Sequence, residues 1–271
     1  MIEILIVLAA LVLVVLFVVR PGRVRPAQLA PFQGWNYAHR GLHTQDKQVA
    51  ENSLPAFAAA VAAGYGMELD VQLSKDGQVV VFHDDTLDRV TGVQGRVDAF
   101  TWEELQKMQL CGGAERMPLF TEVLAVVAGK TPLIVELKSG PRNRELCQKT
   151  LALLREYEGP FCVESFDPTV VAWFKNNAPD ILRGQLADDY HSYKKMPAPL
   201  AFALSRCLGN CLARPQFIAW GPRKKNVMVK LAEAFGPMKV FWTAHADMDT
   251  QALQAEYDGV IFEFYTPRPR Y

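Results

Sequence analysis

The sequence has neither an excess of charge of one sign nor a cysteine pattern that would cross-link it. Its 271 residues carry 29 Lys and Arg against 29 Asp and Glu, and beyond residue 25 the acidic residues outnumber the basic ones by two. A nucleic-acid binder that works through a strongly basic surface is therefore excluded. The five cysteines are odd in number, include no Cys-x-x-Cys pair, and do not resemble a disulfide framework.

Internal repeats and low-complexity segments are also absent, so the chain is not a repeat array. With 21% charged and 50% hydrophobic residues, the composition is not that of a disordered protein. The part of the chain beyond residue 25 is long enough to bury a large core, and its length is typical of a single α/β barrel of roughly 250 residues.

One long apolar run is present, at residues 4–19, and three arginines follow it. With Ile2 included it approaches the ~18 residues that cross a bilayer. A signal peptide has its basic residues before the run, whereas Glu3 stands there in this chain. A buried core helix is the alternative, but no polar residue interrupts the run. We expect residues 1–20 to be a single-pass membrane anchor, with the following domain on the cytoplasmic side.

Residues 21–34, rich in Arg, Pro and Gly, are expected to form a linker, and residues 35–271 one folded domain. In that domain, short apolar runs alternate with helical stretches such as 199–212. This pattern predicts a parallel sheet covered by helices. The expected strands are 36–38, 66–72, 79–82, 133–137, 161–165, 182–186, 217–220, 240–243 and 259–262.

Nine strands exceed an eight-stranded barrel by one, and the second and third expected strands explain the excess. Only a tight turn around Asp76-Gly77 separates them. A parallel crossover needs a dozen or more residues, so the pair must be an antiparallel hairpin. We expect Leu73 to face Gln78 in it. The predicted fold is a (β/α)8 TIM barrel with a small hairpin insertion after its second strand, preceded by one transmembrane helix.

The hairpin brings three polar side chains toward one another. In the expected register, Asp70 faces Val81 and Glu68 faces His83, and residues two apart on a strand share a face. Two carboxylates at this spacing are hard oxygen ligands that suit Mg²⁺ or Ca²⁺. An exposed strand face with an ordinary salt bridge is the alternative for Glu68 and Asp70 taken alone.

Further charged residues end other apolar strands, where burial is costly unless they are paired or metal-bound. His39 and Arg40 follow the first strand, and Glu136 and Lys138 end another. Catalytic residues of barrels collect at the carboxyl ends of the strands. The concentration of histidine, acid and base at strand ends therefore predicts an active site.

These motifs, in order and spacing, resemble the glycerophosphodiester phosphodiesterase family. The resemblance is dense from Tyr37 to Lys138 and looser as far as Ile261. It implies a distorted TIM barrel, a divalent cation (Mg²⁺ or Ca²⁺), and hydrolysis of glycerophosphodiesters to glycerol 3-phosphate and an alcohol. The matching segments are Ala38-His39-Arg40-Gly41, Glu51-Asn52-Ser53, Glu68-Leu69-Asp70-Val71, Phe82-His83-Asp84, Met117-Pro118-Leu119-x-x-Glu122 and Val135-Glu136-Leu137-Lys138.

The resemblance also implies a role for each of these site residues. The general acid/base pair would be His39 and His83. The metal ligands would be Glu68, Asp70 and Glu136, with Glu51 as a further ligand or as an orienting neighbour. Phosphate contacts would come from Arg40 and Lys138, and an apolar pocket wall from Phe166 and Trp242.

Alternatives remain within and beyond this reaction class. The substrate is either a soluble glycerophosphodiester or a lysophospholipid, which a membrane tether would suit. A phospholipase C-like or lyase-type relative would instead release a cyclic phosphate, and a catalytically silent, membrane-anchored binder would have lost one of the site residues. His245 and Glu263 depart from the family pattern at late strand ends. His43 is expected at the surface, and the alternative is that it lines the mouth of the site.

Overall fold

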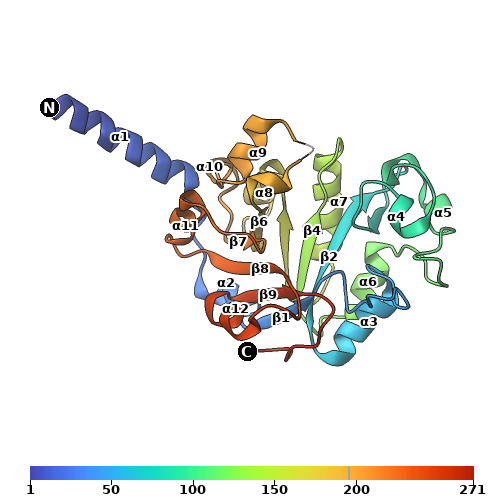
Figure 1. The fold of residues 1–271 in the computed structure, drawn as a ribbon. Helices are drawn as coiled ribbons and strands as arrows, with labels where there is room; N and C mark the ends of the chain where they lie inside the picture. The colour runs from blue at the N-terminus through green and yellow to red at the C-terminus, as the bar shows by residue number, and fades with distance from the viewer. Residues whose placement is uncertain (195) are drawn as a thin grey trace.

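A computed structural model describes residues 1–194 and 196–271 of the chain. Eight parallel strands close into a barrel, because the first strand pairs with both the second and the last. The predicted TIM barrel is therefore confirmed (Figure 1). The barrel strands are β1 (Trp35–Ala38), β2 (Gly66–Leu73), β4 (Leu133–Leu137), β5 (Phe161–Ser165), β6 (Arg183–Ala187), β7 (Phe217–Trp220), β8 (Met238–Ala244) and β9 (Gly259–Phe262).

Helices surround the barrel and place their apolar residues against its outer face (Figure 1). Several helices begin at side-chain caps, such as Ser53, whose hydroxyl accepts a hydrogen bond from the Ala56 amide. The longer ones are α3 (Leu54–Ala63), α6 (Phe120–Val127), α7 (Asn143–Arg155), α8 (Pro168–Asn177), α11 (Val227–Glu233) and α12 (Thr250–Glu256). Short helices fill the loops: α2 (Pro26–Leu29), α4 (Asp88–Thr91), η1 (Val97–Ala99), α5 (Trp102–Leu105) and η2 (Tyr190–Ser192).

The helix expected at 199–212 is two helices, α9 (Ala198–Leu204) and α10 (Asn210–Ala213). Between them Cys207 takes a positive φ of 53°, which ends any continuous α-helix. The prediction of one helix was therefore wrong, because no proline or glycine before Cys207 announces the break.

The predicted hairpin is confirmed, but its predicted register was wrong by one residue. Strand β3 (Val79–Val81) pairs antiparallel with β2 outside the barrel, with Leu73 opposite Val79 and Val71 opposite Val81. The cause is a longer turn: the Ser74 amide donates to the Gln78 carbonyl, and Gly77 takes φ +80°. Three residues rather than two then form the loop, as in hairpins with a left-handed glycine.

Residues 21–34, expected to be a linker, lie against the amino-terminal end of the barrel. They contain α2, and Phe32 is buried against the barrel interior. The Tyr37 hydroxyl on β1 donates a 2.7 Å hydrogen bond to the Phe32 carbonyl. This segment therefore covers the base of the barrel, at the end opposite to the carboxyl ends of the strands.

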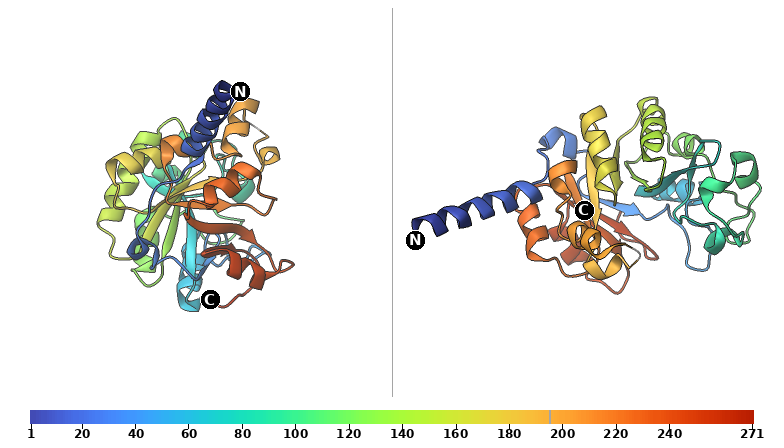
Figure 2. Two further views of the ribbon diagram at one scale, coloured as in Figure 1. Left: turned by 90° about the vertical axis from the view of Figure 1, so that its left-hand side faces the viewer. Right: turned by 90° about the horizontal axis from the view of Figure 1, so that it is seen from above.

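Helix α1 (Ile2–Val19) projects from the barrel domain as a single apolar rod (Figures 1 and 2). Its 18 residues have a mean hydropathy of 3.4, and most of its side chains are exposed. At ~1.5 Å per residue it is about as long as the hydrocarbon core of a bilayer is thick. Helices of this length and composition occur both as membrane anchors and as signal sequences.

Candidate active site

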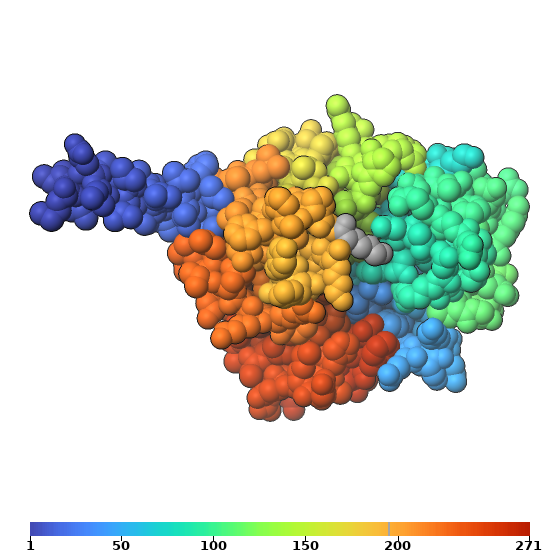
Figure 3. Space-filling model, turned by 45° about the horizontal axis from the view of Figure 1, so that its top comes forward, coloured from blue at the N-terminus to red at the C-terminus, as the bar shows by residue number. Residues whose placement is uncertain are grey.

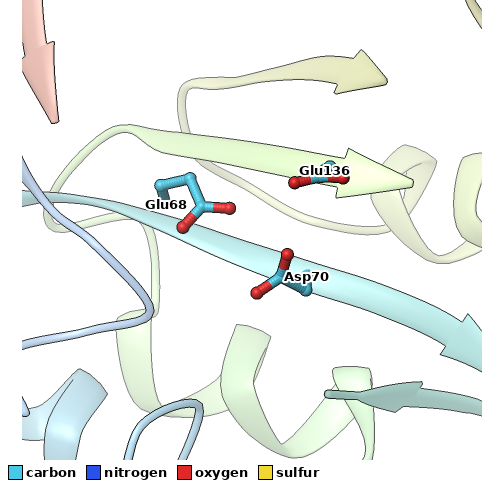
Figure 4. Close-up of side chains that lie close together, drawn as sticks. All are labelled: Glu68, Asp70 and Glu136. Atoms are coloured by element: carbon cyan, nitrogen blue, oxygen red, sulfur yellow. The ribbon is translucent and has the colours of Figure 1, made fainter. Parts of the chain in front are cut away.

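Three carboxylates converge inside the barrel near the carboxyl ends of two neighbouring strands. Glu68 and Asp70 alternate along β2 and share its inner face, and Asp70 lies beside Glu136 in the parallel register of β2 and β4. Each residue offers an oxygen within 4.8 Å of the others, and all three side chains are buried (Figure 4). Glu68 and Asp70 therefore both face the barrel interior and do not lie on an exposed strand face.

A fourth acid extends this group. Glu164 on β5 lies beside Glu136 in the register of the sheet and is 2% exposed. Burial and the neighbouring carboxylates of Glu136 and Asp70 raise the pKa of Glu164 well above its ordinary value. Four carboxylates thus crowd one end of the barrel interior. Glu164 belongs to a segment that matches the family only loosely, and no role was predicted for it from the sequence.

The shared environment pushes the acids in different directions. Burial and the charges of Asp70 and Glu136 raise the pKa of Glu68 well above its ordinary value. Burial would raise the pKa of Asp70 too, but Lys138, His83 and Arg40 outweigh burial and hold it far below its ordinary value.

Two cations balance part of this charge, as the sequence predicted from strand ends. Lys138 Nζ lies 2.9 Å from Glu136 Oε1 and 3.3 Å from Asp70 Oδ1. Arg40 Nε lies 3.7 Å from Asp70 Oδ2, and the Arg40 backbone takes a positive φ of 54°. Both cations are mostly buried, so water and salt screen their charge only weakly.

Glu51 lies outside the group of converging carboxylates, between two arginines. Its Oε1 accepts a 2.8 Å hydrogen bond from Arg40, and both its oxygens accept bonds of 2.6 and 2.7 Å from Arg89. The next residue, Asn52, donates a 2.8 Å hydrogen bond to Asp70 Oδ2. The Glu51-Asn52 motif therefore orients one cation and one acid of the site. Arg89, on α4, had no sequence signal.

His39 is placed at the end of β1 against two acids. Its Nε2 lies 4.0 Å from Glu68 Oε2, and its Nδ1 lies 3.4 Å from Glu263 Oε1. Burial lowers the pKa of His39 to about 4, although the Glu263 carboxylate opposes the shift. The ring is therefore neutral at neutral pH and can accept a proton.

Glu263 follows β9 and contacts a second histidine. His43 Nε2 lies 2.9 Å from Glu263 Oε1, and the His43 side chain is 7% exposed. The expectation that His43 lies at the surface was therefore wrong. Burial would raise the pKa of Glu263, but hydrogen bonding to the two histidines outweighs it and keeps the pKa well below its ordinary value. The packing of Phe264 against the rings of His43 and His245 completes this corner.

His83 lies just beyond β3, the strand that pairs with β2 outside the barrel. The one-residue difference in hairpin register does not move His83 to the other face, because β3 ends at Val81 and His83 lies beyond the paired residues. Its Nδ1 lies 2.6 Å from Asp84 Oδ1, and Asp84 also accepts a hydrogen bond from Arg89. The side chain of His83 is 31% exposed, twice the 15% of His39. Of the two rings, His83 is the one open to solvent.

A cavity of about 850 Å³ opens from this group to the surface, and both His83 and Lys138 line it. Its apolar side is an aromatic cluster, in which Phe166 packs edge-on against Trp242 at 5.5 Å and against Tyr193 at 6.3 Å between ring centroids. Phe166 and Trp242 thus lie where a pocket wall was expected, and Tyr193 joins them from a loop without a recognisable pattern. One side of the cavity is charged and the other is aromatic.

The buried acids fit a divalent cation. Glu68, Asp70 and Glu136 offer converging oxygens, and Asp70 Oδ1 is buried without a hydrogen bond from any of the described residues. Lys138 lies 3.3 Å from that oxygen, but Lys138 and Arg40 face four buried carboxylates, and buried acidic charge that is not balanced by cations is costly. Oxygen donors from carboxylates are the ligand type that Mg²⁺ and Ca²⁺ prefer.

The chain is similar in sequence to known proteins. Residues 39–266 match the model of the glycerophosphoryl diester phosphodiesterase family. A glycerophosphodiester phosphodiesterase from Caldanaerobacter subterraneus subsp. tengcongensis is 38% identical over 246 residues, which cover 83% of this chain and 91% of the relative. A lysophospholipase D from Rattus norvegicus is 34% identical over 47% of this chain and 43% of its own length.

The barrel is also similar to solved structures. A phosphodiesterase from Oleispira antarctica, solved in complex with the product sn-glycerol-3-phosphate, superposes with a TM-score of 0.70. The two sequences are 23% identical, and the match covers 87% of this chain and 95% of the other. At that identity the likeness supports the fold.

Proposed function

This chain belongs to the glycerophosphoryl diester phosphodiesterase family, and we propose that it hydrolyses glycerophosphodiesters to glycerol 3-phosphate and an alcohol with His39 and His83 as its acid/base pair. One observation carries the assignment of the site. His39 lies 4.0 Å from Glu68 in the buried acidic group, and Lys138, which contacts Asp70 and Glu136 of the same group, lines one cavity together with His83. Such an arrangement suits the cleavage of an anionic diester.

The two histidines differ in environment in the way that acid/base chemistry needs. His39 is buried, and burial lowers its pKa to about 4, so it starts neutral and accepts a proton from the attacking hydroxyl. His83 is more exposed, and its Nδ1 lies 2.6 Å from Asp84 Oδ1. It donates a proton to the departing alcohol. The oxygen of the substrate's glycerol 2-hydroxyl forms a bond to phosphorus as the alcohol leaves, which gives a cyclic phosphate. Water then opens this ring, with His83 accepting the proton of the water and His39 returning its proton to the departing glycerol oxygen.

Arg40 and Lys138 hold the phosphate. In the transition state of phosphodiester cleavage, negative charge accumulates on the phosphoryl oxygens, and fixed cations stabilise that charge. Glu51 keeps the Arg40 guanidinium in place through its 2.8 Å hydrogen bond. We assign Glu51 this orienting role, which was one of the two expected of it. Phe166 and Trp242 contact the apolar part of the substrate.

Glu68, Asp70 and Glu136 would hold a divalent cation, either Mg²⁺ or Ca²⁺. Such an ion, when bound, polarises a phosphoryl oxygen and neutralises the charge that develops on it. Without a cation, the pKa of Glu68 is raised and that of Asp70 is lowered. A cation bound among these carboxylates would favour the ionised form of both.

We further propose that α1 is retained as a single-pass membrane anchor, with the barrel on the cytoplasmic side. The last turn of α1 supports this reading, because Val19 is fully buried among Ile218, Trp220 and Val229. Removal of a signal sequence ending near residue 20 would open that core. The proposed division of the chain is thus an anchor at 1–20, a connecting segment at 21–34 and the catalytic domain at 35–271.

Product analysis tests the proposed reaction. The full-length protein in detergent is incubated with glycerophosphocholine, glycerophosphoglycerol and an acyl-bearing lysophospholipid, and the products are followed by phosphorus NMR. Glycerol 3-phosphate from the first two substrates is the expected product. Accumulation of a cyclic phosphate would assign the chain to the lyase-type reaction, and absence of turnover on all three would contradict the proposal.

A further inference from the structure

The base of α1 is held rigidly by the helices that follow β6 and β7. Asn210 on α10 donates a 2.7 Å hydrogen bond to the Val19 carbonyl. Arg214 donates to the carbonyls of Phe17 and Arg20 at 2.8 and 2.7 Å, and its guanidinium stacks on the Phe17 ring. Because α1 cannot swivel on such contacts, a membrane-spanning α1 fixes which face of the barrel domain meets the bilayer.

The face beside that base exposes large apolar side chains. We call the surface of residues 198–235, which include α9, α10 and α11, the flank. In Figure 3 these orange residues lie between the base of α1 and the teal residues of α4. Five large apolar residues on this face have exposed fractions of 42–76%, which is unusual for a group on one solvent-exposed surface. The exposed set is Leu200, Phe202, Leu212, Val227 and Phe235.

Basic residues predominate on the flank, where Glu233, at the end of α11, is mostly buried and pairs with Lys225. From Tyr190 to Ala232 the sequence has eight Lys and Arg residues and no Asp or Glu. Lys224 and Lys230 are exposed and form no ion pair within the described part of the chain. Basic side chains interspersed with exposed apolar ones fit the surface of a bilayer that contains anionic lipids.

The same segment reaches the active-site cavity. Tyr193, Lys194 and Met196 line the cavity, and they lie immediately before α9. The Tyr193 ring contacts Phe166, so the aromatic wall inside the cavity continues outward to the flank. An acyl chain that leaves the bilayer beside α9 would meet apolar side chains over this route.

We propose that the flank rests on the anionic bilayer that α1 spans, and that it delivers membrane-embedded lysophospholipid headgroups to the cavity. This inference rests on the proposed function and names its substrate class. The similarity to a lysophospholipase D is consistent with it. The barrel supplies the chemistry, while the flank determines which diesters reach it.

The enzymatic test compares two substrates on the same proteoliposomes. The full-length protein is reconstituted in vesicles of phosphatidylcholine and phosphatidylglycerol, which contain an acyl lysophosphatidylcholine or are supplied with soluble glycerophosphocholine. The variants are Leu200→Ser with Phe202→Ser, and Lys224→Glu with Lys230→Glu. We expect each pair to lower turnover of the embedded substrate by roughly fivefold or more. One basic side chain at an anionic surface is worth about a fivefold change in binding, and burial of a large apolar side chain is worth at least as much.

Lys130→Glu is the matched control. Lys130 is exposed and follows α6, outside the flank and outside the cavity lining, so its reversal leaves both rates unchanged. All variants should hydrolyse glycerophosphocholine at the wild-type rate. If the wild-type protein does not hydrolyse soluble glycerophosphocholine, the proposed function itself is contradicted. Equal turnover of the embedded substrate by wild type and both flank variants would overturn the flank proposal alone.

A second measurement reports on contact without catalysis. Cys211 on α10 is exposed, whereas the other described cysteines are buried or half-buried. An environment-sensitive dye attached to Cys211 should shift to the blue in anionic vesicles and be quenched by lipids that carry a quencher. Cys211→Ser provides the background. A water-like, unquenched signal in the labelled wild type would overturn the proposal even if the enzyme is active.

Discussion

The charged side chains at the mouth of the barrel and those of the flank beside α1 differ in burial and in pairing. We call the active site at the carboxyl ends of the barrel strands the mouth. At the mouth, acids and bases are buried and paired, as in the 2.9 Å contact of Lys138 with Glu136. On the flank, lysines such as Lys224 are exposed among apolar side chains. Buried charge is costly and is kept where chemistry needs it, whereas exposed charge sets where the protein sits. Changes at the mouth should therefore affect every substrate, and changes on the flank only those that a membrane presents.

Removal of either proposed acid/base residue should give the largest effect. His39→Ala and His83→Ala should each lower kcat by on the order of 10²–10⁴, because each removes one proton transfer. The loss should be equal for soluble and embedded substrates. His191→Ala, at an exposed histidine on η2, is the matched control and should keep the wild-type rate. Near-normal turnover by either folded variant would refute the assignment of that histidine.

Removal of one carboxylate from the acidic group should come next. Glu136→Gln should lower kcat by roughly 10²–10³, the loss seen when one electrostatic contributor to transition-state stabilisation is removed. Thermal unfolding provides a second readout. Mg²⁺ or Ca²⁺ at 100 times its Kd should stabilise the wild type by about 2.7 kcal/mol, and this gain should shrink in the variant. An undiminished cation effect in Glu136→Gln would place the ion elsewhere.

The pH profile probes the buried histidine at the mouth. Because burial lowers the pKa of His39 to about 4, kcat/KM should persist as pH falls through 6 and decline only near 4, where the ring becomes protonated. The Glu263 carboxylate favours the protonated ring, so Glu263→Gln should move the acid limb to still lower pH. An acid limb near pH 6.5 in the wild type, or a limb that moves upward in Glu263→Gln, would contradict this picture.

The smallest expected effect lies at the base of α1. Asn210→Ala removes the hydrogen bond to the Val19 carbonyl and should cost about 1–3 kcal/mol, since a buried carbonyl loses its donor. Denaturant unfolding of the detergent-solubilised chain measures this loss. Turnover of glycerophosphocholine should not change. A drop in that soluble activity would show that the mouth and the base of α1 are not independent.

Much of the fold could be predicted because its signals are local. Short apolar runs between helical stretches predicted the strands, and Asp76-Gly77 predicted the hairpin. The hairpin register is also set locally, but Asp76-Gly77 is compatible with a two-residue or a three-residue loop, and the pairing of Ser74 with Gln78 selects the longer one. The break at Cys207 was equally hidden, since a positive φ at a non-glycine residue has no reliable sequence mark.

The site residues that belong to strand-end motifs could be predicted from the sequence. Those that meet only because distant strands pair in the closed barrel could not. Glu164 looks like one ordinary polar residue in β5, and only the parallel register places it beside Glu136. His43 meets Glu263 because β9 closes the barrel against β1, which brings together residues 220 positions apart. Arg89 likewise reaches Glu51 from a short helix whose position no periodicity indicates.

The central claim is that the acids at the mouth hold a divalent cation that glycerophosphodiester hydrolysis requires. The most direct measurement is the rate of glycerol 3-phosphate release from glycerophosphocholine by the full-length protein, before chelation with EDTA, after it, and after Mg²⁺ or Ca²⁺ is added back. We predict that chelation abolishes release and that one of the two ions restores it. Full activity in EDTA would contradict the account.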